Sequence, residues 1–225
     1  MKKTIIAALL VLSGVASAQT TKQINVSKYD EIAISGPYIV ELVAGTEGEI
    51  TLFGEQQDLD NIVVKCDGEH LVIKPAKHIK WKNKAVRITI PFESLSELAL
   101  AGSGSITSKA RIKADHFEIA LSGSGRIALD LDTKELEAAL SGSGKIELAG
   151  KTSKAEANVS GSGKILAFEL QSAVADANVS GSGSCEVTCS DAITARISGS
   201  GRIHYKGNPV KEDTKVAGSG SIAKS

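Results

Sequence analysis

The sequence predicts an all-β protein folded as a single-stranded parallel β-helix, or β-solenoid, with about 18–21 residues per rung. Two observations carry this prediction. The triplet Gly-Ser-Gly occurs seven times in the 225 residues, beginning at positions 102, 123, 142, 161, 181, 199 and 218. Apolar residues recur at every second position on both sides of the triplets. This is the period of a strand and excludes a helix in the repeats.

Two columns are apolar in all seven copies. Two residues before the first glycine stand Leu100, Leu121, Leu140, Val159, Val179, Ile197 and Val216, and four residues after it stand Ile106, Ile127, Ile146, Ile165, Cys185, Ile203 and Ile222. In a parallel coil such columns stack at about 4.8 Å and fill the interior. The spacing favours this coil over an antiparallel meander in which each triplet is a hairpin turn. The glycines would then mark corners, because glycine tolerates the positive φ of a tight bend.

The N-terminus has the pattern of a secretory signal peptide over residues 1–18. Lys2-Lys3 supply the basic start, residues 5–12 the apolar segment, and residues 16–18 an A-x-A cleavage site. This pattern predicts an exported mature chain that is periplasmic, outer-surface or secreted. No later stretch is apolar enough to predict a transmembrane segment.

The chain before the triplets is less regular. We expect residues 19–225 to form one solenoid domain, in which residues 19–97 are irregular N-terminal rungs or a cap and residues 98–225 the regular repeats. Gly36-Pro37-Tyr38 takes the place of a triplet in an early, degenerate rung. Further strands are predicted at residues 49–53, 62–66, 70–74 and 85–91. A cap would cover an open end whose unpaired backbone groups invite polymerisation.

The composition argues against nucleic acid as a partner. Without Lys2-Lys3 the chain has 24 basic and 26 acidic residues, whereas nucleic-acid binding needs a net basic face. The three cysteines, Cys66, Cys185 and Cys189, are an odd number, so at least one is expected to stay unpaired. Cys185 stands in an isoleucine column, which favours a small buried hydrophobe over a metal or redox role.

The sequence contains no motif for catalysis, metal binding or a cofactor. It lacks a nucleophile elbow, a phosphate loop, and HExxH and EF-hand patterns, and its four histidines are scattered. Polysaccharide-cleaving β-helix enzymes need clustered acids or a calcium site, and the nearest candidates here are Asp130 and Asp132. Because neighbouring rungs have no equivalents of this pair, a solubilising role is preferred, and we expect a non-enzymatic protein without cofactors.

A basic stretch is the first candidate for ligand binding. It has one aromatic residue and no acid, and it comprises Lys74, Lys77, Lys80, Trp81, Lys82, Lys84 and Arg87. Such a loop suits an anionic glycan, because the charges hold the polymer while the indole stacks on a sugar. The alternative is a solvated hairpin whose lysines block edge pairing.

A basic column is the second candidate. It lies three residues after the first glycine and comprises Arg126, Lys145 and Lys164, with Arg202 following after Ser184. If the rungs stack in register, these side chains form an outward ladder that needs Glu147, Glu186 or an anionic ligand as compensation. The alternative is a solvated face that prevents sideways aggregation.

The repeated unit, an apolar residue followed by Ser-Gly-Ser-Gly-x-Ile, resembles the putative auto-transporter adhesin head GIN domain proteins of Bacteroidetes-type bacteria. This resemblance covers most of the mature chain and implies a right-handed β-solenoid in an envelope or extracellular setting. We therefore expect adhesin-like binding of a surface glycan or a cell-surface protein. Two alternatives remain: a scaffold that self-assembles as a homo-oligomer through the solenoid ends and, less favoured, a polysaccharide-cleaving enzyme.

Overall fold

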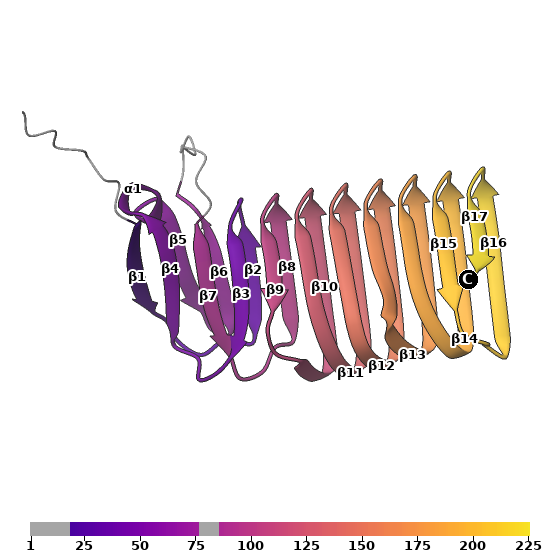
Figure 1. Cartoon of the computed structure of the whole chain (residues 1–225), viewed down its shortest axis with the longest axis horizontal. Coiled ribbons are helices and arrows are strands. Elements are labelled where there is room, and N and C mark those ends of the chain that lie inside the picture. Colours follow the sequence, from indigo (N-terminus) through magenta and orange to yellow (C-terminus); the bar gives the residue numbers. More distant parts are fainter. Residues whose placement is uncertain (1–18, 77–85) are drawn as a thin grey trace, which may run out of the picture.

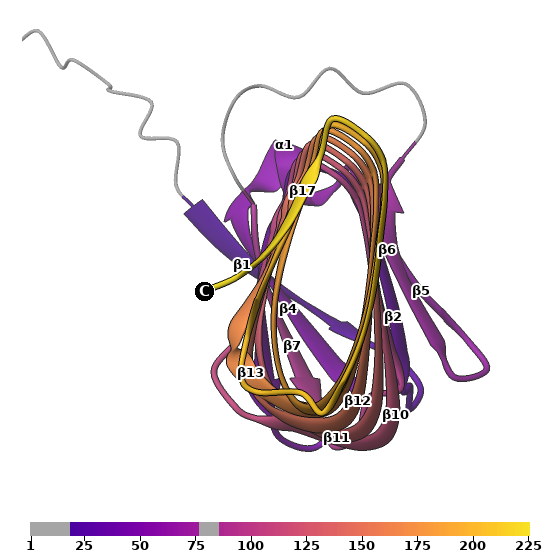
Figure 2. The ribbon, with the colours of Figure 1, turned by 90° about the vertical axis from the view of Figure 1, so that its right-hand side faces the viewer.

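The computed structural model describes residues 19–76 and 86–225, and most of these residues lie in β-strands. The strands wind into a right-handed β-solenoid of about seven turns. Figure 1 shows the rungs side by side along the long axis, and Figure 2 looks along this axis at an elongated cross-section with two long walls. The all-β parallel solenoid predicted from the repeats is confirmed.

The Gly-Ser-Gly repeats form rungs that pair in parallel. Their strands are β8 (Glu97–Gly102), β9 (Ser105–Ser108), β10 (Ile112–Gly123), β11 (Arg126–Gly142), β12 (Lys145–Gly161), β13 (Lys164–Gly181), β14 (Ser184–Gly199), β15 (Arg202–Lys206), β16 (Lys211–Gly218) and β17 (Ser221–Lys224). From β11 to β14, each long strand leaves one corner, descends one wall and climbs the other to the next corner (Figure 2). Leu140 lies opposite Val159 and Ile127 opposite Ile146, so the predicted columns stack in register.

The two apolar columns face the interior. Leu121 and Val159 are 1% and 2% exposed, and Ile146 is fully buried. At the last rung the interior becomes polar, because Glu212 on β16 lies opposite Ile193 of β14. Val216 on the same strand is 41% exposed. A polar outer rung is typical of the end of a repeat stack.

Both glycines of a corner are required by the structure. Gly142 has a φ of +118°, a conformation that side chains rarely adopt. A Cβ added at Gly144 would lie 2.7 Å from the carbonyl oxygen of Gly125 in the preceding corner. Between them Ser143 is exposed, and its amide donates a 2.9 Å hydrogen bond to the carbonyl oxygen of Gly123. The corners therefore stack backbone on backbone.

The order of rungs in the stack differs from their order in the chain at the N-terminal end. β2 (Glu31–Ser35) and β3 (Ile39–Ala44) form the predicted degenerate rung, with Ile34 opposite Leu100 and Val40 opposite Ile106. The other side of this rung pairs with β6 (His70–Pro75) and β7 (Arg87–Phe92). After the rung of β2 and β3, the chain forms the rung of β6 and β7 on one side of it. The chain then crosses to the other side of the first rung, where β8 begins.

Antiparallel strands lie outside these rungs. β4 (Glu49–Glu55) pairs with β7 and with β1 (Gln19–Asn25), while β5 (Ile62–Asp67) pairs with β6. A short helix that the sequence did not predict, α1 (Gln56–Leu59), follows β4, and its Leu59 is fully buried. The change of strand direction ends the parallel stacking, as a cap has to do.

The three cysteines are free thiols. Cys185 is fully buried in its column, opposite Ile165 and Ile203, which confirms the interpretation as a small hydrophobe. Burial and the nearby Glu186 raise the pKa of the Cys185 thiol to about 12. Cys189 is 1% exposed, and burial raises its pKa as well. Cys66 is only partly buried.

We expect Cys66 alone to react with iodoacetamide in the folded protein. The reaction should be slow, because partial burial and the Asp67 charge raise the pKa of this thiol and the thiolate is the reactive form. Mass spectrometry before and after unfolding in guanidinium measures the number of adducts. Cys66→Ser should give no adduct in the folded state, and labelling of Cys185 before unfolding would contradict the burial.

Candidate binding faces

The basic stretch is only partly within the described residues. Lys74 at the end of β6 and Arg87 at the start of β7 are both exposed. The other members, Lys77, Lys80, Trp81, Lys82 and Lys84, lie outside the described residues. Glycan binding by this stretch therefore stays a prediction.

The basic column forms a ladder in register on the wall that follows each corner. Arg126 lies opposite Lys145, and Lys145 lies opposite Lys164. Glu147 compensates part of the charge, since its carboxylate accepts hydrogen bonds from Arg126 and, at 2.6 Å, from the ammonium group of Lys145. Lys164 has no ion pair within the described part of the chain. We call Arg126, Lys145 and Lys164 the basic ladder.

A hollow of 460 Å³ lies beside the basic ladder. Lys145, Lys164 and the hydroxyl-bearing Ser162 and Ser184 are among its lining residues. Burial raises the pKa of Glu147, but the hydrogen bonds from Lys145 and Arg126 outweigh this effect and the net pKa is lowered. Glu147 thus stays ionised and offsets part of the positive charge of the basic ladder. The lysine and serine side chains that line the hollow can still bind carboxylate or sulfate groups of a ligand.

The other wall carries a row of carboxylates that the columns considered above do not include. Its members stand five residues before the first glycine of the six corners from Gly36 to Gly181 and pair in register: Glu31, Glu97, Glu118, Glu137, Glu156 and Asp176. Parallel neighbours lie about 4.8 Å apart, and like charges directly opposite destabilise a sheet. Within the described residues only Glu31 has an ion-pairing contact, with His70 of β6. We call these six residues the acidic row.

Neighbouring charges and hydrogen bonds act on several members of the acidic row. Burial and the neighbouring Glu118 and Glu31 raise the pKa of Glu97, while His70 acts in the opposite direction. Further along, the amide of Asn158 donates to Glu156 at 3.0 Å and that of Asn178 to Asp176 at 2.9 Å. These hydrogen bonds hold the two carboxylates in place.

A groove of 670 Å³ runs along the same wall between the acidic row and the corners. The column three residues before the first glycine lines it with Ala33, Ala99, Ala120, Ala139, Asn158 and Asn178, and at the C-terminal end with the cationic Arg196 and Lys215. The column next to the glycine adds Ser122, Ser141, Ser160 and Ser180. Because both columns hold small side chains as far as β13, the stacked strands leave a trough whose N-terminal half is largely apolar and whose C-terminal end carries two cations. We call the outer face of this wall, formed by β8 and by the parts of β10 to β14 that lead up to the corners, the groove wall.

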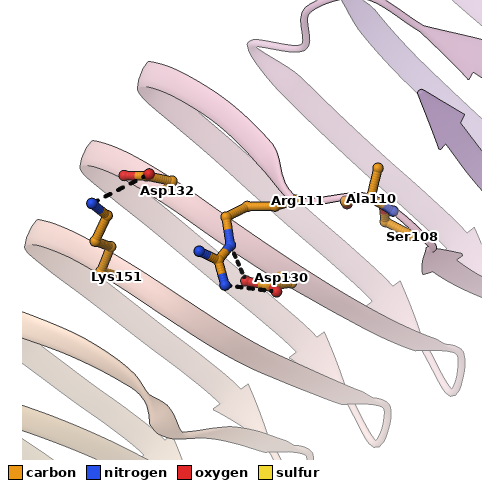
Figure 3. A network of polar contacts seen from close by, with 6 residues as sticks. All are labelled: Ser108, Ala110, Arg111, Asp130, Asp132 and Lys151. Carbon is orange, nitrogen blue, oxygen red and sulfur yellow. Dashed lines mark hydrogen bonds and ion pairs between the residues drawn. The ribbon is translucent and has the colours of Figure 1, made fainter. Parts of the chain in front are cut away.

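The two acids considered for catalysis are both ion-paired (Figure 3). The guanidinium of Arg111 donates to the Asp130 carboxylate at 2.8 and 3.1 Å, and Lys151 lies 3.4 Å from Asp132. The hydrogen bond to Asp130 and its charge raise the pKa of Arg111. Both carboxylates connect neighbouring rungs, as a structural surface role requires. In the described residues no group of three or more His, Cys, Asp or Glu side chains could hold a metal ion.

A stack of rungs with long charged walls is the architecture of extended binding and scaffold proteins. The chain belongs to the family described as "Putative auto-transporter adhesin, head GIN domain", whose model matches residues 28–209. The resemblance seen in the repeats is thereby confirmed. Over the described ranges, no helix has the length and apolar character needed to cross a membrane.

Solved structures of similar proteins cover nearly the whole chain. A putative adhesin from Bacteroides fragilis has a TM-score of 0.89 at 23% identity, covering 93% of this chain and 98% of that one. A putative lipid binding protein from Parabacteroides distasonis has a TM-score of 0.76 at 30% identity, with the same coverage of 93% and 98%. A putative adhesin from Parabacteroides merdae has a TM-score of 0.74 at 21% identity, covering 93% and 97%. No curated protein matches this chain.

Proposed function

We propose that this protein is exported, acts without catalysis at the cell envelope, and binds an anionic surface glycan along the basic ladder. The family description and two of the similar structures name adhesins, which supports a binding role. The signal-peptide pattern of residues 1–18 supports export. The proposal of a glycan ligand rests on one observation: Arg126, Lys145 and Lys164 lie in register beside a hollow whose lining includes serines.

An acidic polysaccharide repeats its charged groups along its length, so it can contact several rungs at once. Each exposed ion pair contributes only about 0.2–1 kcal/mol. Linked contacts add up, because the first contact holds the next group at a high effective concentration. Lys164 is the strongest position of the basic ladder, since Glu147 already pairs with the other two cations.

Lys164→Glu is expected to weaken binding to polygalacturonate and dextran sulfate by about tenfold at low salt, because it replaces an attraction with a repulsion. Biolayer interferometry of residues 19–225 at two salt concentrations, with neutral dextran beside the anionic polymers, measures this change. A variant in which Lys77, Lys80, Lys82 and Lys84 become glutamate tests the basic stretch separately.

Lys154→Glu is the matched control, because Lys154 is an exposed lysine on the groove wall. It makes the same change in net charge away from the basic ladder. Equal weakening by the two variants, or no binding of any anionic polymer by the unchanged chain, would refute the glycan proposal.

Self-association through the last rung is the second candidate. β16 pairs with β14 and β17 with β15, and within the described residues neither strand pairs on its other side. An open parallel edge can accept another strand. Val216 is also exposed there. Assembly of a scaffold through this edge stays a prediction.

A further inference from the structure

We propose that the groove wall is a docking surface for a cationic, amphipathic segment of a partner polypeptide. The segment would lie along the solenoid axis, with its apolar side chains in the groove and its lysine or arginine side chains over the acidic row. This surface lies on the opposite wall from the basic ladder (Figure 2). The proposal is therefore independent of the glycan-binding function.

The groove supplies the apolar part of the surface. Ala99, Ala120 and Ala139 stand side by side on three successive rungs, in register, and line the groove together. Long polar side chains would normally cover the outer face of a sheet, but alanine leaves the strands uncovered. A continuous hollow with small apolar side chains on an otherwise charged surface is typical of an interaction site.

The acidic row determines what kind of partner fits. Elsewhere this protein compensates its outward carboxylates across rungs: Arg111 pairs with Asp130, Lys151 with Asp132, and Arg126 with Glu147. The five members from Glu97 to Asp176 form no ion pair among the described residues, although they stack directly on one another. Within this part of the chain only Asp176, at the C-terminal end, has an arginine close enough for a favourable charge interaction, Arg196. The repulsion between the stacked carboxylates lowers stability unless a cationic partner compensates it.

The two features together favour a polypeptide. An anionic lipid or glycan would be repelled by the acidic row, and a small free cation would leave the apolar groove uncovered. Five rungs span about 19 Å, the length of about 13 residues of α-helix. A short basic helix or strand of this length can present apolar side chains to the groove and cationic side chains to the acidic row. The side-chain amides of Asn158 and Asn178 offer further hydrogen bonds.

The test uses residues 19–225 and a synthetic 14-residue peptide of leucine and lysine that forms an amphipathic helix, with binding followed by isothermal titration calorimetry. A triple variant, Glu118→Gln, Glu137→Gln and Glu156→Gln, is expected to bind the peptide at least about tenfold more weakly, because three ion pairs are lost. A second variant, Ala120→Gln with Ala139→Gln, fills the groove without changing the charge and should also weaken binding severalfold.

The matched control changes three other carboxylates, Glu49→Gln, Glu169→Gln and Asp191→Asn, and should bind as the unchanged chain does. Equal weakening in this control would overturn the proposal in favour of non-specific attraction. An unaltered affinity in the groove-filling variant would also overturn it, since the acidic row would then act without the groove. Binding of phosphatidylcholine vesicles in place of the peptide would reassign the groove to lipid.

Loss of folding cannot imitate the expected result. The Glu→Gln triple variant removes repulsion within the acidic row, so its melting temperature should equal or exceed that of the unchanged chain. Circular dichroism of each variant checks this before the titration. Weaker binding by a triple variant that remains fully folded is the outcome that supports the docking surface.

Discussion

Gly142→Ala is expected to destabilise the protein by about 4 kcal/mol, because it combines backbone strain with a clash between two corners. The φ of Gly142 is +118°, and an added Cβ would lie 2.5 Å from the carbonyl oxygen of Gly123. That oxygen belongs to the backbone of the preceding corner, so it cannot move without shifting a rung. Urea unfolding followed by circular dichroism measures the free energy of unfolding.

Two controls separate the clash from other effects of the substitution. Ser143→Ala lies in the same corner at an exposed position and should change stability by less than about 0.5 kcal/mol. Gly68 has a φ of +62°, and no atom lies within 4 Å of an added Cβ. Gly68→Ala should therefore cost only the conformational strain of about 1 kcal/mol. If Gly142→Ala costs no more than this, the corners do not stack as closely as described.

Phe117→Ala is expected to cost about 3–5 kcal/mol, because it leaves a cavity in the interior. Phe117 is fully buried on β10, opposite Leu136 of β11. Both strands are held by hydrogen bonds to their neighbours, so the walls cannot close around the missing ring. The same urea titration measures the loss.

Phe117→Leu and His116→Ala are the controls for this cavity. Leucine already occupies the same column at position 136, so Phe117→Leu should cost about 1–2 kcal/mol. His116 is the exposed neighbour on the same strand, and its replacement should stay within about 0.5 kcal/mol. A cost below about 1 kcal/mol for Phe117→Ala would show that the column is not close-packed.

The regular rungs could be predicted from the sequence because each one is specified by its own residues. Alternation marks the strands, and a corner such as the one at Gly142 needs glycine wherever it occurs. Leu140 and Ile146 therefore indicated the interior before any packing was known, and both are buried. The basic ladder followed from the same alignment, since residues in one column must meet once the rungs are in register.

The groove wall was missed although its residues stand in the same alignment. Column five before the first glycine is acidic from Glu97 to Asp176, and column three is alanine at positions 99, 120 and 139. The acidic column could have been found by comparing the outward-facing columns of the alignment for repeated charge. Whether a carboxylate is neutralised, however, depends on a cation in another rung, as Asp130 and Glu147 illustrate.

The sequence by itself determined the solenoid, its corners and its buried columns, since these depend on residues close together in the chain. Only the tertiary structure decided which rungs are neighbours at the N-terminal end, where the rung of β2 and β3 lies between that of β6 and β7 and that of β8 and β9. The reason is physical: any strand with an alternating apolar face can stack on any other, so the local pattern does not specify its neighbour. That choice depends on the burial and backbone pairing of the whole stack, and the antiparallel strands β4 and β5 then close its end.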